Sequence, residues 1–146
     1  MAWFRFLIFF SLWASAFSNV VLAVMYLTGA IYDLEFMGMA DAVYAEYPSM
    51  RALDVAFAIA AVGIAVFSVY TRFRLAGFKK NGPQTLAVLY ILSCAVSVLY
   101  AFVSSAMIGE LSASDLSSLS VNVLVTAILV AANRIYFDKR KHLFVN

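Results

Sequence analysis

Four long apolar segments constrain this chain more than any other feature of its sequence. The first, from Phe6 to Thr28, has 23 residues and no charged side chain, and a helix of that length extends about 34 Å. A membrane-spanning helix needs about 20 consecutive apolar residues. The chain of 146 residues is 65% hydrophobic and 12% charged, whereas soluble domains carry about 25% charged residues. These features exclude an ordinary soluble domain.

The apolar segments predict an all-α, polytopic membrane protein, a single domain over residues 1–146 that forms a bundle of four transmembrane helices. The predicted spans are residues 6–28, 48–70, 85–109 and 119–137. The second span is long enough only if it begins near Pro48, a residue that suits the first turn of a helix, and takes in Arg51 and Asp54. Arg5 leaves a cleavable signal peptide as an alternative for the first segment, although its apolar length favours a retained anchor.

The charged residues outside these spans alternate in sign along the chain. Acidic residues occupy the first and third loops, at Asp33, Glu35, Asp41, Glu46, Glu110 and Asp115. Nine of the ten basic residues lie in the N-terminal segment, the middle loop and the C-terminal tail, and Arg51 is the exception. Since basic loops stay in the cytoplasm, we predict a multi-pass protein of a bacterial-type inner cell membrane, with both termini cytoplasmic and both acidic loops outside.

The first acidic loop, residues 32–48, is longer than a turn requires. Its apolar residues can form a short helix on the outer surface, although Gly38 weakens a helix there. Tyr32, Tyr44 and Tyr47 are expected at the outer interface, where aromatic side chains gather. On the opposite side, the basic loop and tail are expected to contact anionic lipid headgroups, with about 1 kcal/mol from each basic residue.

Small residues recur every four positions along the third predicted span. They are Ser93, Ser97, Ala101, Ser105 and Gly109. Helices in lipid approach one another closely where such residues share a face, so the stripe predicts a helix-packing seam. We favour a seam within the monomer, and the alternatives are a contact between protomers and the wall of a polar path.

Asp54 and Arg51 are the leading candidates for a ligand site or an ion path. Asp54 lies about 9 Å from a helix start at Pro48, where a carboxylate is unfavourable unless it is paired or protonated. Arg51 lies three positions earlier on the same helix face and can supply the pair. The two residues predict either a polar cavity that binds an ion, a proton or a small charged ligand, or a self-neutralised ion pair.

Asn19 and Asn122 complete the set of candidates for a polar path. An asparagine amide in hydrocarbon needs hydrogen-bond partners. A bond between helices is the simpler explanation for both residues, and a place along the path of an ion or ligand is the alternative.

The residue types that catalysis and metal binding need are scarce. Cys94 is the only cysteine, which excludes an internal disulfide or a paired-cysteine site. His142, the only histidine, lies in the basic tail, away from any nucleophile in the spans. We therefore expect no catalytic activity, no cofactor and no metal site. Nucleic-acid binding is not expected either, because any cytoplasmic loop of this kind carries similar basic residues.

Together these features predict a small integral membrane protein without catalytic activity, an interaction or accessory subunit that acts through helix–helix contacts. Its expected partners are the lipid bilayer and either further copies of the chain, in a homo-oligomer, or another membrane protein. The alternative is a small channel or transporter for an ion or a small polar solute, with a polar path near Asp54. An enzyme that acts on lipids ranks third, because no acid–base pair is visible.

Overall fold

The described part of the chain is helical throughout. Our computed structural model describes residues 2–35, 38, 40–109 and 113–145, and these ranges contain no strand. Within them, four segments are long and apolar enough to cross a membrane: Ala2–Thr28, Pro48–Ala76, Gly82–Ile108 and Leu116–Asp138. The all-α class and the four apolar helices are therefore confirmed.

Each long helix includes residues outside its predicted span. The first comprises α1 (Ala2–Phe6), the π-helical turn η1 (Leu7–Ser11) and α2 (Leu12–Thr28), and the others are α5 (Pro48–Ala76), α6 (Gly82–Ile108) and α7 (Ala113–Asp138). Many of the added residues are polar or basic, such as Arg5, Arg72 and Arg74. A hydropathy pattern marks the apolar layer that a helix crosses, whereas backbone hydrogen bonding continues the helix beyond that layer.

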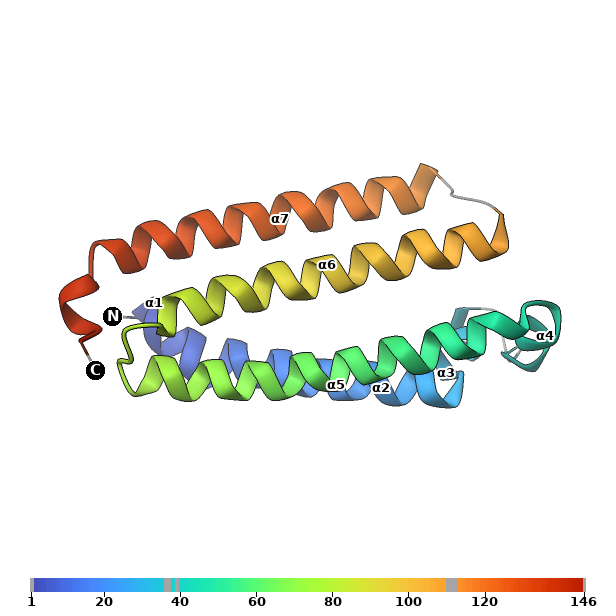
Figure 1. The fold of residues 1–146 in the computed structure, drawn as a ribbon, viewed down its shortest axis with the longest axis horizontal. Helices are drawn as coiled ribbons and strands as arrows, with labels where there is room; N and C mark the ends of the chain where they lie inside the picture. The colour runs from blue at the N-terminus through green and yellow to red at the C-terminus, as the bar shows by residue number, and fades with distance from the viewer. Residues whose placement is uncertain (1, 36–37, 39, 110–112, 146) are drawn as a thin grey trace.

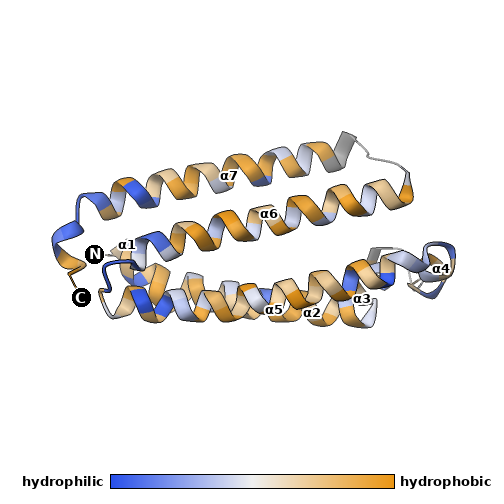
Figure 2. Cartoon of the chain, in the orientation of Figure 1, coloured by the Kyte–Doolittle hydropathy of each residue, from blue (hydrophilic) through white to orange (hydrophobic). Residues whose placement is uncertain are grey.

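The long helices run alternately in opposite directions. Figure 1 shows α2 and α5 side by side, α6 next to them and α7 on the far side of α6. Both chain ends lie at one end of the molecule, beside the turn between α5 and α6, and the short helix α4 (Ala40–Glu46) lies at the opposite end. Hydrophilic residues gather near the chain ends, and the middle of each long helix is largely hydrophobic (Figure 2).

Small residues bring α2 and α5 close together in the middle of the molecule. Ala23 of α2 packs against Ala58 and Ala61 of α5, and all three are buried. A hydrogen bond of 3.2 Å joins Ser15 Oγ to Ser68 Oγ across the same interface. Close backbone approach with an occasional polar pair is how helices commonly associate in lipid, and it makes α2 and α5 the most extensively packed pair.

Aromatic side chains fill the core at the end that holds both termini. The ring of Phe4 in α1 stacks on that of Phe78 at a centroid distance of 5.2 Å, and it meets the ring of Phe137 edge-on at 6.4 Å. Trp3 Nε1 donates a hydrogen bond of 3.0 Å to Asn133 Oδ1. The first and last long helices are thus joined here, although 130 positions separate the bonded residues.

The segment between the first two spans forms two short helices and not the single one predicted. Helix α3 (Ala30–Glu35) follows Gly29, and α4 follows Gly38. Both glycines have a positive φ, 79° and 88°, a conformation that glycine adopts at little cost, so the backbone turns sharply at each one. Residues 36, 37 and 39, which the predicted helix would contain, lie outside the described residues.

Gly29 is a position where an added side chain fits poorly. A Cβ atom there would lie 3.1 Å from Tyr44 Cε2 and 3.3 Å from Ala40 Cβ, on a backbone with positive φ. We expect Gly29→Ala to lower the free energy of unfolding by about 1–2 kcal/mol. Unfolding in mixed micelles, followed by circular dichroism, measures this change.

Gly63→Ala is the matched control for that variant. Gly63 is helical and has no neighbouring atom within 4 Å of an added Cβ, and alanine is the better helix former. This control should leave the free energy of unfolding unchanged or raise it. An equal loss in the two variants would contradict the prediction for Gly29.

Candidate functional site

Asp54, the leading candidate from the sequence, lies inside the helix bundle. It is on α5, six residues after Pro48, or about 9 Å along the helix, and its exposed fraction is 0%. A carboxylate removed from water in this way is unfavourable unless it receives hydrogen bonds or a counter-charge. The groups around Asp54 therefore determine what this site can do.

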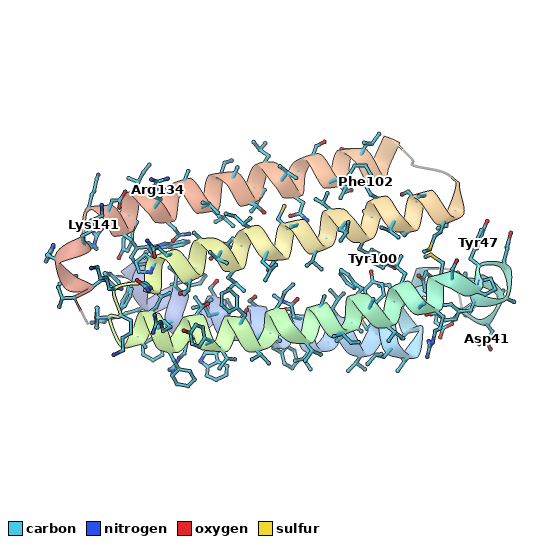
Figure 3. The ribbon with its side chains drawn as sticks, viewed as in Figure 1. Asp41, Tyr47, Tyr100, Phe102, Arg134 and Lys141 are labelled. Carbon is cyan, nitrogen blue, oxygen red and sulfur yellow. The ribbon has the colours of Figure 1, made fainter. Side chains whose placement is uncertain are left out.

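Three tyrosine hydroxyl groups donate hydrogen bonds to the Asp54 carboxylate. Tyr44 of α4 donates to Oδ2 over 2.8 Å, whereas Tyr100 of α6 and Tyr32 of α3 donate to Oδ1 over 2.9 and 3.2 Å. Figure 3 shows Tyr100 on the side of α6 that faces α5. The four residues, which we call the tyrosine–aspartate cluster, link α3, α4, α5 and α6.

Ring packing holds these hydroxyl groups in position. The ring of Tyr100 packs against those of Phe57 and Tyr26, at centroid distances of 4.5 and 5.1 Å. The rings of Tyr32 and Tyr44 meet edge-on at 5.4 Å. Aromatic pairs commonly adopt such distances. Apolar rings thus surround the cluster, and hydrogen bonds to a charged group are strong in such surroundings.

Arg51 does not have the partner that the sequence predicts. Within the described residues, Arg51 and Asp54 form no ion pair. The Arg51 side chain is exposed, and its guanidinium carbon lies 5.1 Å from the centroid of the Tyr44 ring. Tyr44 therefore stands between the two charges, because its ring faces the cation while its hydroxyl group binds the carboxylate. This cation–π contact replaces the predicted ion pair.

Burial raises the pKa of Tyr32 and Tyr44, the two cluster tyrosines outside the long helices. Desolvation is the largest cause for both, and the neighbouring Asp54 carboxylate raises each pKa further. The Tyr100 hydroxyl group, 3.2 Å from that of Tyr32, lowers the pKa of Tyr32, and Arg51 lowers the pKa of Tyr44, but neither effect reverses the direction. Both hydroxyl groups therefore keep their protons at neutral pH and act as donors.

The two asparagine candidates have other partners. Asn19 is half-buried, and its Nδ2 group donates to the backbone oxygen of Ser15, one turn earlier, over 2.8 Å. Asn122 of α7 is exposed, and its Oδ1 atom accepts a hydrogen bond of 3.5 Å from Thr126 Oγ1. In the ranges that the structure describes, neither asparagine is hydrogen-bonded to Asp54. The candidates therefore do not form one polar network.

The small-residue stripe of α6 is largely half-buried. Ser93, Ser97, Ala101 and Ser105 are partly covered, and Gly109 is exposed. Ser97 Oγ donates to the backbone oxygen of Ser93 over 3.0 Å, which satisfies that hydroxyl group within its own helix. Helix α6 packs against both α5 and α7, as a seam within the monomer requires. A contact between protomers stays a prediction.

The tyrosines that bind Asp54 are not among the site candidates that the sequence singles out. Tyr32 and Tyr44 fit an interfacial aromatic belt equally well, and Tyr100 lies within a charge-free apolar run. One signal was available, namely the shortage of basic residues on the acidic side of the chain. With Arg51 as the single cation there, hydroxyl groups are the natural donors to a buried carboxylate.

Comparison of the chain with protein families, with curated proteins and with solved structures finds no match. The tyrosine–aspartate cluster and the packing of α7 are therefore the observations on which a function can be proposed.

Loss of one hydroxyl group leaves the buried carboxylate short of a donor. We expect Tyr44→Phe to lower the free energy of unfolding by about 2 kcal/mol, because a hydrogen bond to a charged group contributes about 1.5–3 kcal/mol. Unfolding in mixed micelles measures this loss. In the control Tyr47→Phe, a half-buried tyrosine of the same segment, the change should stay below about 0.5 kcal/mol. Full additivity of Tyr44→Phe with Asp54→Asn would contradict their coupling in the cluster.

The raised pKa values of Tyr32 and Tyr44 make stability fall in alkaline solution. Tyrosine in the unfolded chain ionises near its ordinary pKa of 10.0, whereas these two keep their protons to higher pH in the folded chain. Above that pH the folded state holds more protons, so each unit of pH lowers the free energy of unfolding by about 1.4 kcal/mol per such tyrosine.

Tyr32→Phe should therefore make the fall of the free energy of unfolding with pH less steep, by about 1.4 kcal/mol per pH unit, which is the contribution of one such tyrosine. Unfolding in mixed micelles between about pH 9 and 11 measures the slope, which does not depend on the absolute stability of the variant. An unchanged slope would show that Tyr32 ionises at its ordinary pKa in the folded chain.

Proposed function

We propose that this chain is a non-catalytic integral membrane protein that acts through helix–helix contacts, and that α7 is the helix that meets its partner. The packing of α7 is the observation that supports this proposal. Helix α7 lies against α6, and only 6% of its apolar stretch is buried inside the chain, against 33% for Pro48–Ala76. Most of the surface of α7 is therefore available to another helix.

The polar side chains of α7 strengthen the proposal, because lipid chains cover a purely apolar surface as well as a protein does. Asn122 is exposed and lies six residues inside the span Leu116–Asp138, about 9 Å along the helix axis. Thr126 follows one turn deeper. In a hydrocarbon layer about 30 Å thick, an amide at that depth is costly unless it meets hydrogen-bond partners.

A second copy of the chain suits Asn122 as a partner. The carboxamide group both donates and accepts hydrogen bonds, so Asn122 in two copies can bond reciprocally across a two-fold axis. We therefore propose a homodimer through α7 in a cell membrane. The end of the molecule that holds the basic residues lies on the cytoplasmic side in this proposal, as the positive-inside rule indicates.

The alternative function, a small channel or transporter, stays a prediction. Its path would pass Asp54, whose side chain is fully buried and bonded to Tyr32, Tyr44 and Tyr100. Transport at this position would require the hydroxyl groups to separate from the carboxylate. The exposed polar side chains of α7 favour the interaction function.

Self-association in vesicles tests the proposed function. Donor- and acceptor-labelled chains are reconstituted in phosphatidylcholine vesicles, and energy transfer is measured as the ratio of protein to lipid is varied. The unmodified chain should associate, and Asn122→Leu should weaken association about three- to thirtyfold, since a hydrogen bond between helices in lipid contributes about 0.6–2 kcal/mol.

Val121→Leu is the matched control, because Val121 is exposed on the same helix and carries no polar group. Its association should match that of the unmodified chain. If Val121→Leu and Asn122→Leu weakened self-association equally, the Asn122 amide would have no specific role in the dimer. An unmodified chain that stays monomeric at every density would overturn the homodimer.

A further inference from the structure

A groove lies between α6 and α7 at the end of the molecule that holds both termini. Its volume is about 830 Å³, within the range of sites that hold a small molecule or a lipid segment. Residues from the start of α6 and the end of α7 form its walls, and the tail closes it through Phe144. This groove is separate from the tyrosine–aspartate cluster, which lies toward the other end.

The mouth of the groove is basic. Lys80, Arg134 and Lys141 line it, together with a single acidic residue, Asp138. Asp138 pairs with Lys141 over 3.2 Å, so three cations and one anion leave a net charge of +2. Figure 3 shows Arg134 near the end of α7 and Lys141 in the segment that follows this helix. An anion at this mouth would therefore find cations that are not already neutralised.

The start of α6 adds to the attraction for an anion. Helix α6 begins at Gly82, and Asn81 and Pro83 line the groove beside Lys80. The N–H groups of Gly82 and Thr85 already donate to Lys79 O and Asn81 O, and Pro83 has no N–H, so this helix start contributes mainly the partial positive charge of the helix dipole. That partial charge favours an anion near the groove, and the basic side chains supply most of the attraction.

Away from its mouth the groove is apolar. Val88 and Ile91 of α6 and Val130 of α7 line this part, and both α6 residues are more than half exposed. From Pro83 to Ile91 the wall extends about 12 Å along the helix. A ligand that matches the whole groove needs a negative headgroup and a hydrocarbon chain attached to it.

We propose that the groove binds one anionic glycerophospholipid. Its phosphate lies between Lys80 and Arg134, and one acyl chain lies along Val88, Ile91 and Val130. A free phosphate ion would use the basic mouth alone, and a zwitterionic phospholipid would gain less from the net positive charge there. The site is independent of the proposed dimer, because Asn122 does not line the groove.

The test is a titration of the purified full chain in detergent with dioleoyl phosphatidylglycerol, with the bound lipid counted by native mass spectrometry. We expect Arg134→Gln to weaken binding about fivefold, the effect of one basic residue near an anionic group. Lys139→Gln is the matched control, because Lys139 is exposed, is near the same helix end and does not line the groove. Its binding should change less than about twofold.

A second variant tests the apolar wall with every charge retained. Ile91→Trp fills the groove and should weaken phosphatidylglycerol binding at least about fivefold, whereas excess inorganic phosphate should not displace the lipid. Lys80→Gln takes the place of Arg134→Gln if the latter changes the helical circular dichroism spectrum.

Four results would overturn the proposal. They are equal weakening by Arg134→Gln and Lys139→Gln, equal affinity for dioleoyl phosphatidylcholine, full binding by Ile91→Trp, and displacement of the lipid by inorganic phosphate. Either of the first two results would show that the basic residues of the groove do not select an anionic headgroup. Either of the last two would show that the acyl chain does not bind in the groove and that the site binds only an anion.

Discussion

The burial of one carboxylate in an apolar helix bundle is the constraint that organises the acidic end of this molecule. Asp54 is fully buried and has no ion pair within the described residues, so neutral hydrogen-bond donors must stabilise its carboxylate. Tyr32, Tyr44 and Tyr100 supply these donors from three different helices. Because each hydroxyl group must reach the same two oxygen atoms, the positions of α3, α4 and α6 on α5 are fixed together. The acidic end is thus built around a polar centre.

The opposite end of the molecule is held together by apolar packing and not by a buried charged group. Aromatic rings meet there, around Phe4 and Phe137, and the middle of the molecule is held by alanine contacts such as Ala23 with Ala58. Helix α7 contributes Phe137 to the aromatic core and Asn133 to the hydrogen bond with Trp3, and it takes little part in the rest of the packing. The three innermost helices therefore form a firmly packed unit, and α7 is attached to that unit through α6 and through the end that holds the termini.

The four long apolar helices could be predicted because hydropathy and segment length are local properties of the sequence. The partner of Asp54 could not, because it depends on packing between distant segments. Helical spacing puts Arg51 and Asp54 on one face of α5, but it does not say that Asp54 is buried whereas Arg51 is exposed. The Asp54 carboxylate is bonded to hydroxyl groups and not to the expected counter-charge, and one of these donors, Tyr100, is 46 positions away. Gly38 was recognised as weakening a helix, and its positive φ divides the outer segment into α3 and α4.

The boundaries of the helices likewise depend on more than the local apolar content of the sequence. Apolar content predicts where a chain enters hydrocarbon, and it says little about the polar turns that extend α5 through Arg72 and Arg74. Those turns carry the cations to one end of the molecule. The groove between α6 and α7 arises there, and no spacing rule could reveal it because it needs two helices in a particular register.

The aromatic core beside the termini has a consequence for biosynthesis. Phe4 contacts Phe144 as well as Phe137, at centroid distances of 6.1 and 6.4 Å, so residues from both extremes of the polypeptide complete one another's packing. During translation, the native neighbours of Phe4 are complete only after α7 and Phe144 have been synthesised. The turn around Phe4, which is synthesised before α7 and Phe144, is therefore among the last parts of the molecule to reach its native packing.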